Sequence, residues 1–132
     1  MKLTLTQAKS IVKMLDFKDG LVVAVACDFK TKDILMVAFQ NKEAVFKTLT
    51  TGVVHYWSRS RKKLWMKGEE SGHIQKLKSA RVDCDGDALL LDVEQVGAAC
   101  HEGYRSCFYR KVKRDKLGHV MKKKFNPKDV YR

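Results

Sequence analysis

The sequence has no long hydrophobic run. None of its apolar segments approaches the roughly 20 residues that a helix needs to cross a bilayer, and the N-terminal stretch MKLTLTQAKS has no apolar signal-peptide core. Internal repeats and low-complexity segments are also absent. These absences predict a cytoplasmic protein with no membrane partner. At 132 residues, we expect one domain over residues 1–132.

The chain also lacks the C-x2-C pairs of a zinc ribbon, although it has four cysteines, Cys27, Cys84, Cys100 and Cys107. In a cytosolic protein, cysteines are more often metal ligands or buried thiols than disulfides. Cys100 and Cys107 lie in one loop and could reach a common metal. Cys84 would add a third thiolate, which leaves a tetrahedral zinc one open position for catalysis. The alternative, small buried hydrophobic side chains, stays open, and we favour it for Cys27.

Acidic residues are few relative to basic ones, so the formal net charge is +12. A basic balance can indicate nucleic acid, an anionic surface or an anionic small substrate. Residues 111–132 hold nine Lys or Arg against two Asp, so +7 of the total lies in this tail. A charged C-terminal end is most often solvated or partly disordered. The charge is therefore weak support for a nucleic-acid partner, and we predict none.

Hydrophobic periodicity predicts two helices and a mostly antiparallel sheet. One helix begins at Thr6 as its N-cap, and the other covers residues 42–50, between an Asn41 cap and Gly52. Strands are expected at 21–27 and 34–39, which form a hairpin, and at 53–60, 64–66, 74–83, 88–96 and 107–112. This pattern is typical of the α+β class.

Three carboxylates occupy alternate positions, Asp83, Asp85 and Asp87. They resemble the start of a calcium loop, but an apolar strand follows at once instead of the roughly dozen loop residues that an EF-hand needs. In an extended chain, alternate side chains point the same way, so these carboxylates would repel one another unless a cation or bases neutralise them. A hard divalent ion such as magnesium fits. The alternative is a solvated turn with Gly86 at its tip.

Histidine and arginine supply the other candidates for chemistry. His73, His101 and His55 can titrate near neutral pH, and His101 stands out because it directly follows Cys100. A cluster of hydroxyl and guanidinium groups at one predicted strand end could cradle phosphate, with Arg binding in bidentate fashion. Its members are Ser58, Arg59, Ser60 and Arg61. An exposed strand end without a ligand is the alternative.

These motifs occur together in a known family. The segments LMVAFQNKEAVFKTLTTG, HYWSRSRKKLWMKGEESGHIQK and RVDCDGDALLLDVEQVGAACHEGYRSCFYR resemble phosphoribosyl-AMP cyclohydrolases, which open the adenine ring in histidine biosynthesis. They cover most of residues 34–110. The joint occurrence of WSRSR, SGH, DCDGDALL and ACHEGYRSCF makes the resemblance specific. The first helix and the tail lie outside it.

The resemblance implies an intertwined homodimer with shared zinc sites and a phosphorylated nucleotide substrate. Zinc would be bound by Cys84 of one subunit with Cys100 and Cys107 of the other, and magnesium by the three aspartates. Family members commonly have His where this chain has Met66, so neither proton transfer nor metal ligation is expected at that position. Many relatives carry a fused phosphoribosyl-ATP pyrophosphohydrolase domain, which we expect this chain to lack.

The residues suit the chemistry that the resemblance implies. In the substrate, a phosphoribosyl group on N1 of adenine makes the N1–C6 unit an activated amidine. Zinc can lower the pKa of a bound water to about 7, and attack at C6 followed by cleavage of C6–N1 leaves a carboxamide and a formamidine. A base must take the water proton and an acid must protonate N1. We assign these roles to His101 and His73, in an order that stays open.

Two other classes compete with this interpretation. A zinc-stabilised nucleic-acid module would use the positive charge and the aromatic and basic residues from Tyr56 to Arg61. A structural zinc protein would need a fourth ligand, and His101 could be that ligand.

Overall fold

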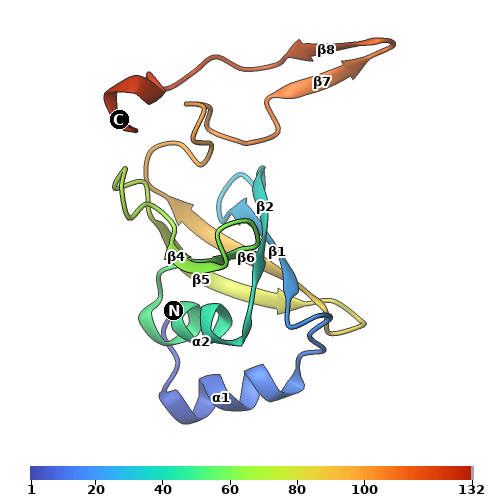
Figure 1. Ribbon diagram of the computed structural model, residues 1–132, viewed down its shortest axis with the longest axis vertical. Helices are drawn as coiled ribbons and strands as arrows, with labels where there is room; N and C mark the ends of the chain where they lie inside the picture. Colours follow the sequence, from blue (N-terminus) through green and yellow to red (C-terminus); the bar gives the residue numbers. More distant parts are fainter. Residues whose placement is uncertain (132) are drawn as a thin grey trace.

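The computed structural model describes residues 1–131, which form two α-helices, eight β-strands and one short 3-10 helix (Figure 1). The helices are α1 (Leu5–Met14), α2 (Lys42–Thr51) and the 3-10 helix η1 (Pro127–Asp129). The strands are β1 (Val22–Asp28), β2 (Ile34–Gln40), β3 (His55–Ser58), β4 (Lys63–Met66), β5 (Gln75–Val82), β6 (Ala88–Gln95), β7 (Arg110–Lys113) and β8 (Lys116–His119). In this described part of the chain, no helix has both the length and the apolar character needed to cross a membrane.

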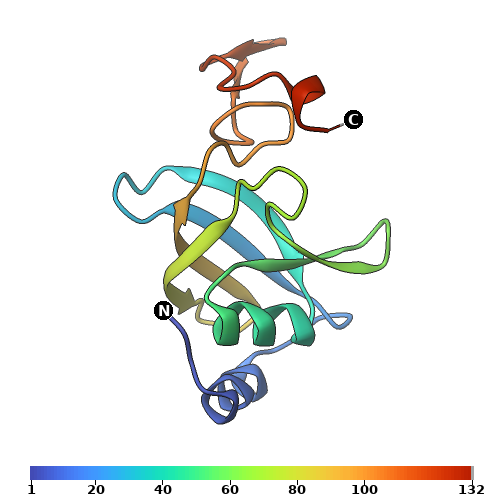
Figure 2. The ribbon, with the colours of Figure 1, turned by 90° about the vertical axis from the view of Figure 1, so that its left-hand side faces the viewer.

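Six strands form one curled sheet in the order β4-β3-β2-β1-β6-β5. Every neighbouring pair is antiparallel except β1 and β6, which run parallel. The curl brings the segment before β3 onto β5, where Val53 bridges Lys76 and the Leu77 N–H donates to the Gly52 carbonyl at 2.9 Å (Figure 2). The predicted α+β class, with two helices and a mostly antiparallel sheet, is therefore confirmed.

The helices pack at one end of the curled sheet and complete its apolar core (Figure 2). Ala8 of α1 and Val45 of α2 are buried against strand residues that include Leu35, Leu77 and Leu91. Burial of one such leucine side chain stabilises the fold by about 2 kcal/mol. The core thus stabilises the sheet at the end where the helices pack. The loops at the opposite end can carry the residues of a site.

The helix termini differ in part from the prediction. Helix α1 is capped by Thr4 rather than Thr6, because Gln7 stands at the third helical position and completes a capping box. The Thr4 Oγ1 accepts from the Gln7 N–H at 3.2 Å, and the Gln7 Oε1 accepts from the Thr4 N–H at 3.0 Å. Both caps predicted for α2 are confirmed, since the Asn41 side chain accepts from Ala44 N–H and Gly52 adopts the left-handed conformation.

The strand predicted at residues 107–112 is wrong in its bounds. The Cys107 N–H donates to the Leu35 carbonyl at 2.7 Å, but β7 begins only at Arg110 and pairs with β8 alone. The hairpin β7–β8 projects away from the main sheet (Figure 1). Residues 111–117 are exposed, as expected of a solvated tail, yet they form this regular hairpin.

Candidate active site

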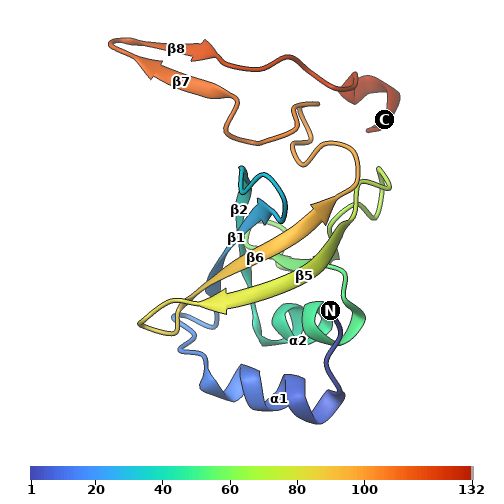
Figure 3. The same ribbon diagram turned by 180° about the vertical axis from the view of Figure 1, so that it is seen from behind.

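The candidate metal ligands lie at opposite ends of β6. The turn that precedes β6 carries Cys84 and the three aspartates, and the loop that follows β6 carries Cys100 and Cys107 (Figure 3). The eight residues of β6 span about 26 Å at a rise of about 3.3 Å per residue. Cys84 therefore cannot share a metal with the other two cysteines of the same chain.

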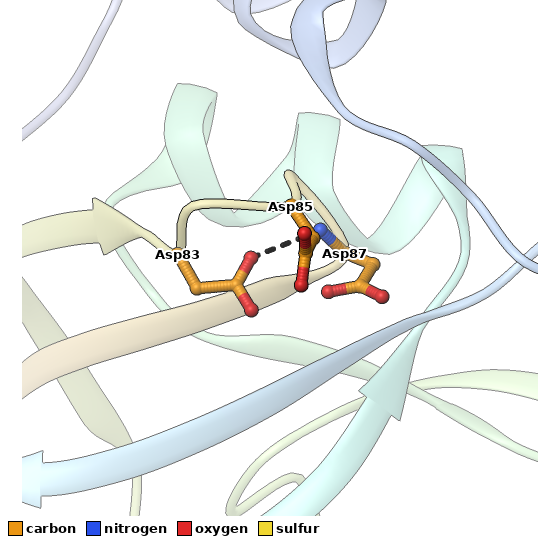
Figure 4. Close-up of side chains that lie close together, drawn as sticks. All are labelled: Asp83, Asp85 and Asp87. Carbon is orange, nitrogen blue, oxygen red and sulfur yellow. Dashed lines mark hydrogen bonds between the residues drawn. The ribbon is translucent and has the colours of Figure 1, made fainter.

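The three aspartates converge because they lie in a turn. The sequence left an extended chain and a turn with Gly86 at its tip as alternatives, and in the structure residues 83–87 form the tight connection between β5 and β6. One carboxylate oxygen from each of Asp83, Asp85 and Asp87 lies within 4.8 Å of the others (Figure 4). The segment after α1 braces this turn, since the Asp16 N–H donates to the Gly86 carbonyl at 2.7 Å.

Electrostatics in this acidic turn favour a bound cation. Slight desolvation opposes ionisation of Asp83, but N–H donors from Asp87 at 3.1 Å and Ala88 at 3.3 Å lower the pKa of that carboxyl. Slight desolvation and the charges of Asp83 and Asp85 raise the pKa of Asp87. Mutual repulsion among exposed carboxylate oxygens at this spacing is what a hard divalent ion relieves. The donor set therefore fits magnesium.

The cysteine loop, residues 97–109, is held against the β1–β2 connection. The Arg105 guanidinium donates to Asp28 and to Asp33, each at 2.9 Å. The Ser106 hydroxyl donates to the Ile34 carbonyl at 2.7 Å. Within the loop, the Cys100 N–H donates to the carbonyl of Tyr104 at 3.0 Å. These bonds place both cysteines beside the start of β2.

The two thiols of this loop are neighbours. Cys100 is buried, whereas Cys107 is exposed as a residue but turns its sulfur toward Cys100. Burial of the sulfur and the adjacent Cys100 thiol raise the pKa of Cys107 to about 12. Two adjacent soft donors fit half of a tetrahedral zinc site, and zinc binding would displace their protons. In residues 1–131, no third ligating side chain completes a set with this pair.

The remaining cysteine behaves as predicted. Cys27 of β1 is buried, and its thiol donates to the Asp92 carboxylate at 2.9 Å. It lies in the sheet rather than in either candidate metal site.

A pocket of about 850 Å³ opens beside the thiol pair. It brings together five of the residues that the sequence singled out, namely Ser58, Arg59, Arg61, His101 and Cys107. Arg59 stacks on the Phe39 ring at 3.9 Å, which leaves the edge of its guanidinium available to an anion. Ser60 is not among the lining residues, and the Ser58 hydroxyl accepts from the Arg61 N–H at 3.2 Å, which shapes the β3–β4 turn.

The two predicted catalytic histidines occupy different environments. His101 lines the pocket with its side chain 76% exposed, and its Nε2 lies 3.2 Å from the Glu102 carboxylate. It therefore faces Glu102 rather than the thiol pair. His73 is half-buried and does not line the pocket. Met66 lines the pocket with a side chain that cannot transfer protons.

Lys67 is a candidate that the sequence analysis missed. It lines the same pocket but is only 5% exposed, and burial lowers the pKa of its ammonium group, against the opposing influence of Cys107 and Cys100. A buried lysine without a carboxylate partner is costly and is typical of a functional site. The sequence did offer one indication of this position. Lys67 stands two residues after Trp65, and alternate residues of an extended chain face the same side.

Comparison with known proteins identifies the family of this chain. Residues 36–109 match the family model described as phosphoribosyl-AMP cyclohydrolase. The relative from Methanosarcina acetivorans with that name is 57% identical over 89% of this chain and 95% of its own length. Relatives of the same name from Methanothermobacter thermautotrophicus and Sulfurisphaera tokodaii are both 55% identical, over 86% and 83% of this chain and 83% and 95% of their own lengths. The chain therefore belongs to the phosphoribosyl-AMP cyclohydrolase family.

Proposed function

We propose that this chain opens the adenine ring of phosphoribosyl-AMP by hydrolysis of the N1–C6 bond, in the cytoplasm, as a step of histidine biosynthesis. Membership in the family supports the reaction. The observation that supports the site is that one pocket is lined by Cys107 of the thiol pair, by a histidine paired with a carboxylate, and by two arginines. Its volume of about 850 Å³ lies in the range of small-molecule sites, about 300–1,000 Å³.

The phosphates of the substrate are assigned to the arginines of the β3–β4 turn. Arg59 and Arg61 line the pocket, and guanidinium groups bind phosphate oxygens through paired N–H donors. Ser58 offers a hydroxyl beside them, and Ser60 supports the turn at 3.4 Å from Ser58. The apolar faces of lining residues such as Trp57 suit a nucleobase.

Two metals complete the proposed site. Cys100 and Cys107 bind zinc together with Cys84 of the partner subunit, and the three aspartates of the acidic turn bind magnesium. Zinc held by these thiolates would supply a water of lowered pKa that is nucleophilic at neutral pH. Lys67 places a positive charge beside Cys107, which favours the ionised, metal-binding form of that thiol.

Proton transfer is assigned to histidine. His101 faces the pocket next to the zinc ligand Cys100, and Glu102 orients its ring from 3.2 Å. An imidazole so placed can take a proton from the attacking water or give one to N1 of the leaving group. His73 is the second candidate and would act from behind the residues that line the pocket.

A homodimer with shared, intertwined sites follows from this ligand assignment. One chain separates Cys84 from the thiol pair by the length of β6, so a second copy must supply the missing thiolate. The partner would insert its acidic turn, which carries Cys84, beside the pocket that Cys107 lines.

Zinc analysis beside turnover tests the proposal. We expect Cys107→Ser to lose most of its zinc and at least about 100-fold of its activity, because a second-row oxygen donor replaces a soft thiolate. The matched control is Cys27→Ala, which removes a cysteine outside the site and should keep about one zinc per chain and near-normal turnover. A fully active Cys107→Ser enzyme would refute the assignment.

A further inference from the structure

The C-terminal tail leaves the cysteine loop and then returns to it. After the projecting β7–β8 hairpin, the chain runs back toward the main sheet and ends near η1 (Figures 1 and 3). The Lys124 N–H donates to the Gly103 carbonyl at 2.6 Å. Gly103 has a φ of 98°, and a Cβ at this position would overlap with the Phe125 carbonyl oxygen. A residue with a side chain could not let the tail lie this close.

The returning tail also packs on His73. The rings of Phe125 and His73 lie 4.9 Å apart between centroids and meet edge to face at 77°. The same imidazole lies against Gly97, where a Cβ would overlap with the ring. Among the described residues, the buried Nδ1 of His73 has no hydrogen-bond partner. The orientation of His73 therefore depends on packing, and Phe125 supplies part of that packing.

The last residues of the tail reach the pocket itself. Pro127 and Tyr131 line it together with His101 and Cys107. The turn that carries them is closed by the Tyr131 N–H, which donates to the Pro127 carbonyl at 2.8 Å. This segment lies outside the residues 36–109 that match the family model, so the family's motifs do not describe it.

We propose that residues 124–131 form a wall of the substrate pocket, in which Tyr131 contacts the bound nucleotide and Phe125 positions His73. The proposal rests on the assignment of this pocket as the substrate site. Tyr131 lines the same pocket as Trp57 and Trp65, and aromatic side chains suit the faces of a nucleobase or ribose. In this proposal the tail contributes through the specific contacts of its packed residues. The competing explanation is that its lysines attract the substrate phosphates without such contacts.

A truncation with a charge-matched control separates these two explanations. A stop after Lys123 removes Lys124, Lys128 and Arg132 against Asp129, a net loss of two positive charges. The control, Lys111→Gln with Lys122→Gln, removes the same net charge from residues that do not line the pocket. We expect the truncation to raise KM for phosphoribosyl-AMP about tenfold, the effect of losing one good contact, and the control to raise it less than about twofold.

Two point variants give independent readings. Tyr131→Ala should raise KM by a similar factor while zinc content and the unfolding temperature stay at wild-type values, which a general loss of structure would not allow. Phe125→Leu keeps an apolar side chain but removes the ring, so it should shift the ring-proton NMR signals of His73. These signals are a readout that simple loss of stability would not move without unfolding.

The outcomes distinguish failure of the tail proposal from failure of the pocket assignment on which it rests. Arg59→Met serves as the reference, because the proposed site requires it to raise KM. If Arg59→Met raises KM while the truncation and Tyr131→Ala keep the wild-type KM, the proposal that residues 124–131 form a wall of the pocket is overturned. The assignment of the pocket as the substrate site then stands. An equal rise of KM in the truncation and the charge control overturns the tail proposal in favour of general attraction. If Arg59→Met leaves KM unchanged, the pocket assignment fails, and the wall fails with it.

Discussion

Within the acidic turn, the three aspartates are not equivalent. Asp83 accepts hydrogen bonds from the N–H groups of Asp87 and Ala88 and so helps to form the turn. In residues 1–131, no backbone or side-chain donor reaches the Asp85 carboxylate, which is exposed. Substitution at Asp85 therefore changes the charge of the candidate cation site without removing a bond that holds the turn together.

Asp85→Asn should weaken the dependence of turnover on magnesium. We expect the magnesium concentration for half-maximal activity to rise about tenfold or more, because one of three charged ligands becomes neutral. Zinc content should stay nearly unchanged, since hard and soft sites are chemically distinct. The test measures metal content beside activity at graded magnesium, and parallel loss of zinc would contradict the existence of two separate sites.

Substitution of Lys67 probes the buried charge beside the thiol pair. Lys67→Met keeps the length of the side chain and removes the cation, so zinc should be lost more readily to a competing chelator, by about tenfold. Lys67→Arg should restore most of the zinc retention. Lys9→Met, at an exposed position of α1 outside the pocket, removes the same charge and should hold zinc as the wild type does. Equal zinc retention in Lys67→Met and wild type would contradict the role given to this lysine.

The residues that sequence reasoning missed share a physical feature. Lys67 was overlooked because a lysine is ordinarily solvated, and only its burial to 5% exposure marks it as a functional candidate. Tyr131 and Phe125 lie in a tail whose charge predicted a solvated end, whereas Phe125 contacts Gly103 and His73 and Tyr131 packs near Phe125. Such contacts join residues far apart in the chain, and no local pattern records them.

Among the elements, the cysteine loop is attached by an ion-pair cluster as well as by hydrogen bonds to β2. Arg105 bridges Asp28 and Asp33 on the β1–β2 connection, beside the hydrogen bonds that the loop donates to carbonyls of β2. The N–H of Thr31, together with that of Lys30 and with Arg105, lowers the pKa of Asp28 against a smaller opposing effect of burial. The carboxylate form of Asp28 is therefore the form that the folded loop favours.

The pH dependence of stability follows from this lowered pKa. A carboxyl whose folded pKa lies below its unfolded value of about 3.9 contributes stability above that pH and loses it as the pH falls through the folded pKa. Asp28→Asn should thus lower the unfolding temperature by about 4 °C at pH 7. The difference should shrink as the pH falls below about 4, where wild-type Asp28 is also protonated.

Thermal unfolding at graded pH measures this difference, and Asp115→Asn on the exposed β7–β8 connection is the control. The control should differ little from wild type at any pH. If the unfolding temperature of Asp28→Asn stayed below that of the wild type by the same amount from pH 7 to pH 3, the result would contradict a charge effect and indicate lost packing instead.

Element by element, the strands of the main sheet and α2 were predictable because their signals are local. Alternation and β-branched runs located β1, β2 and β6, and Asn41 with Gly52 bounded α2. The acidic turn shows where this approach ends. The spacing of the aspartates left an extended strand and a turn as alternatives. The structure has the turn, and its geometry depends on the register between β5 and β6.

For the whole molecule, the distribution of ligands and charge points to assembly. The thiol pair lies at one end of β6 and the acidic turn with Cys84 at the other, so two copies arranged about a twofold axis could complete two sites at once. Val37 of β2 and Val82 of β5 are exposed, at 46% and 47%, and offer apolar surface for such a contact. Sequence could not decide between an in-chain and a cross-chain site, because the decision depends on the distance across β6.

Complementation between two inactive variants tests the shared site. Neither Cys84→Ser nor Cys107→Ser should hold a complete zinc site in its own homodimer. In a mixed dimer, one site takes Cys84 from the Cys107→Ser subunit and the intact thiol pair from the other, while the second site carries both lesions. Random exchange gives about half mixed dimers, each with one good site of two, so activity should recover to roughly a quarter of wild type.

The interpretation of this experiment requires proof that subunits have exchanged, which native mass spectrometry on differently tagged variants provides. A mixture of Cys100→Ser with Cys107→Ser is the matched control, because both lesions fall on the same half of the site. Every site in that mixture lacks one thiol of the pair, so no recovery is expected. If each zinc site were built within one chain, the first mixture would behave like this control. Equal inactivity of the two mixtures after verified exchange would therefore overturn the shared site, while the loss of zinc in each single variant would still identify the ligands.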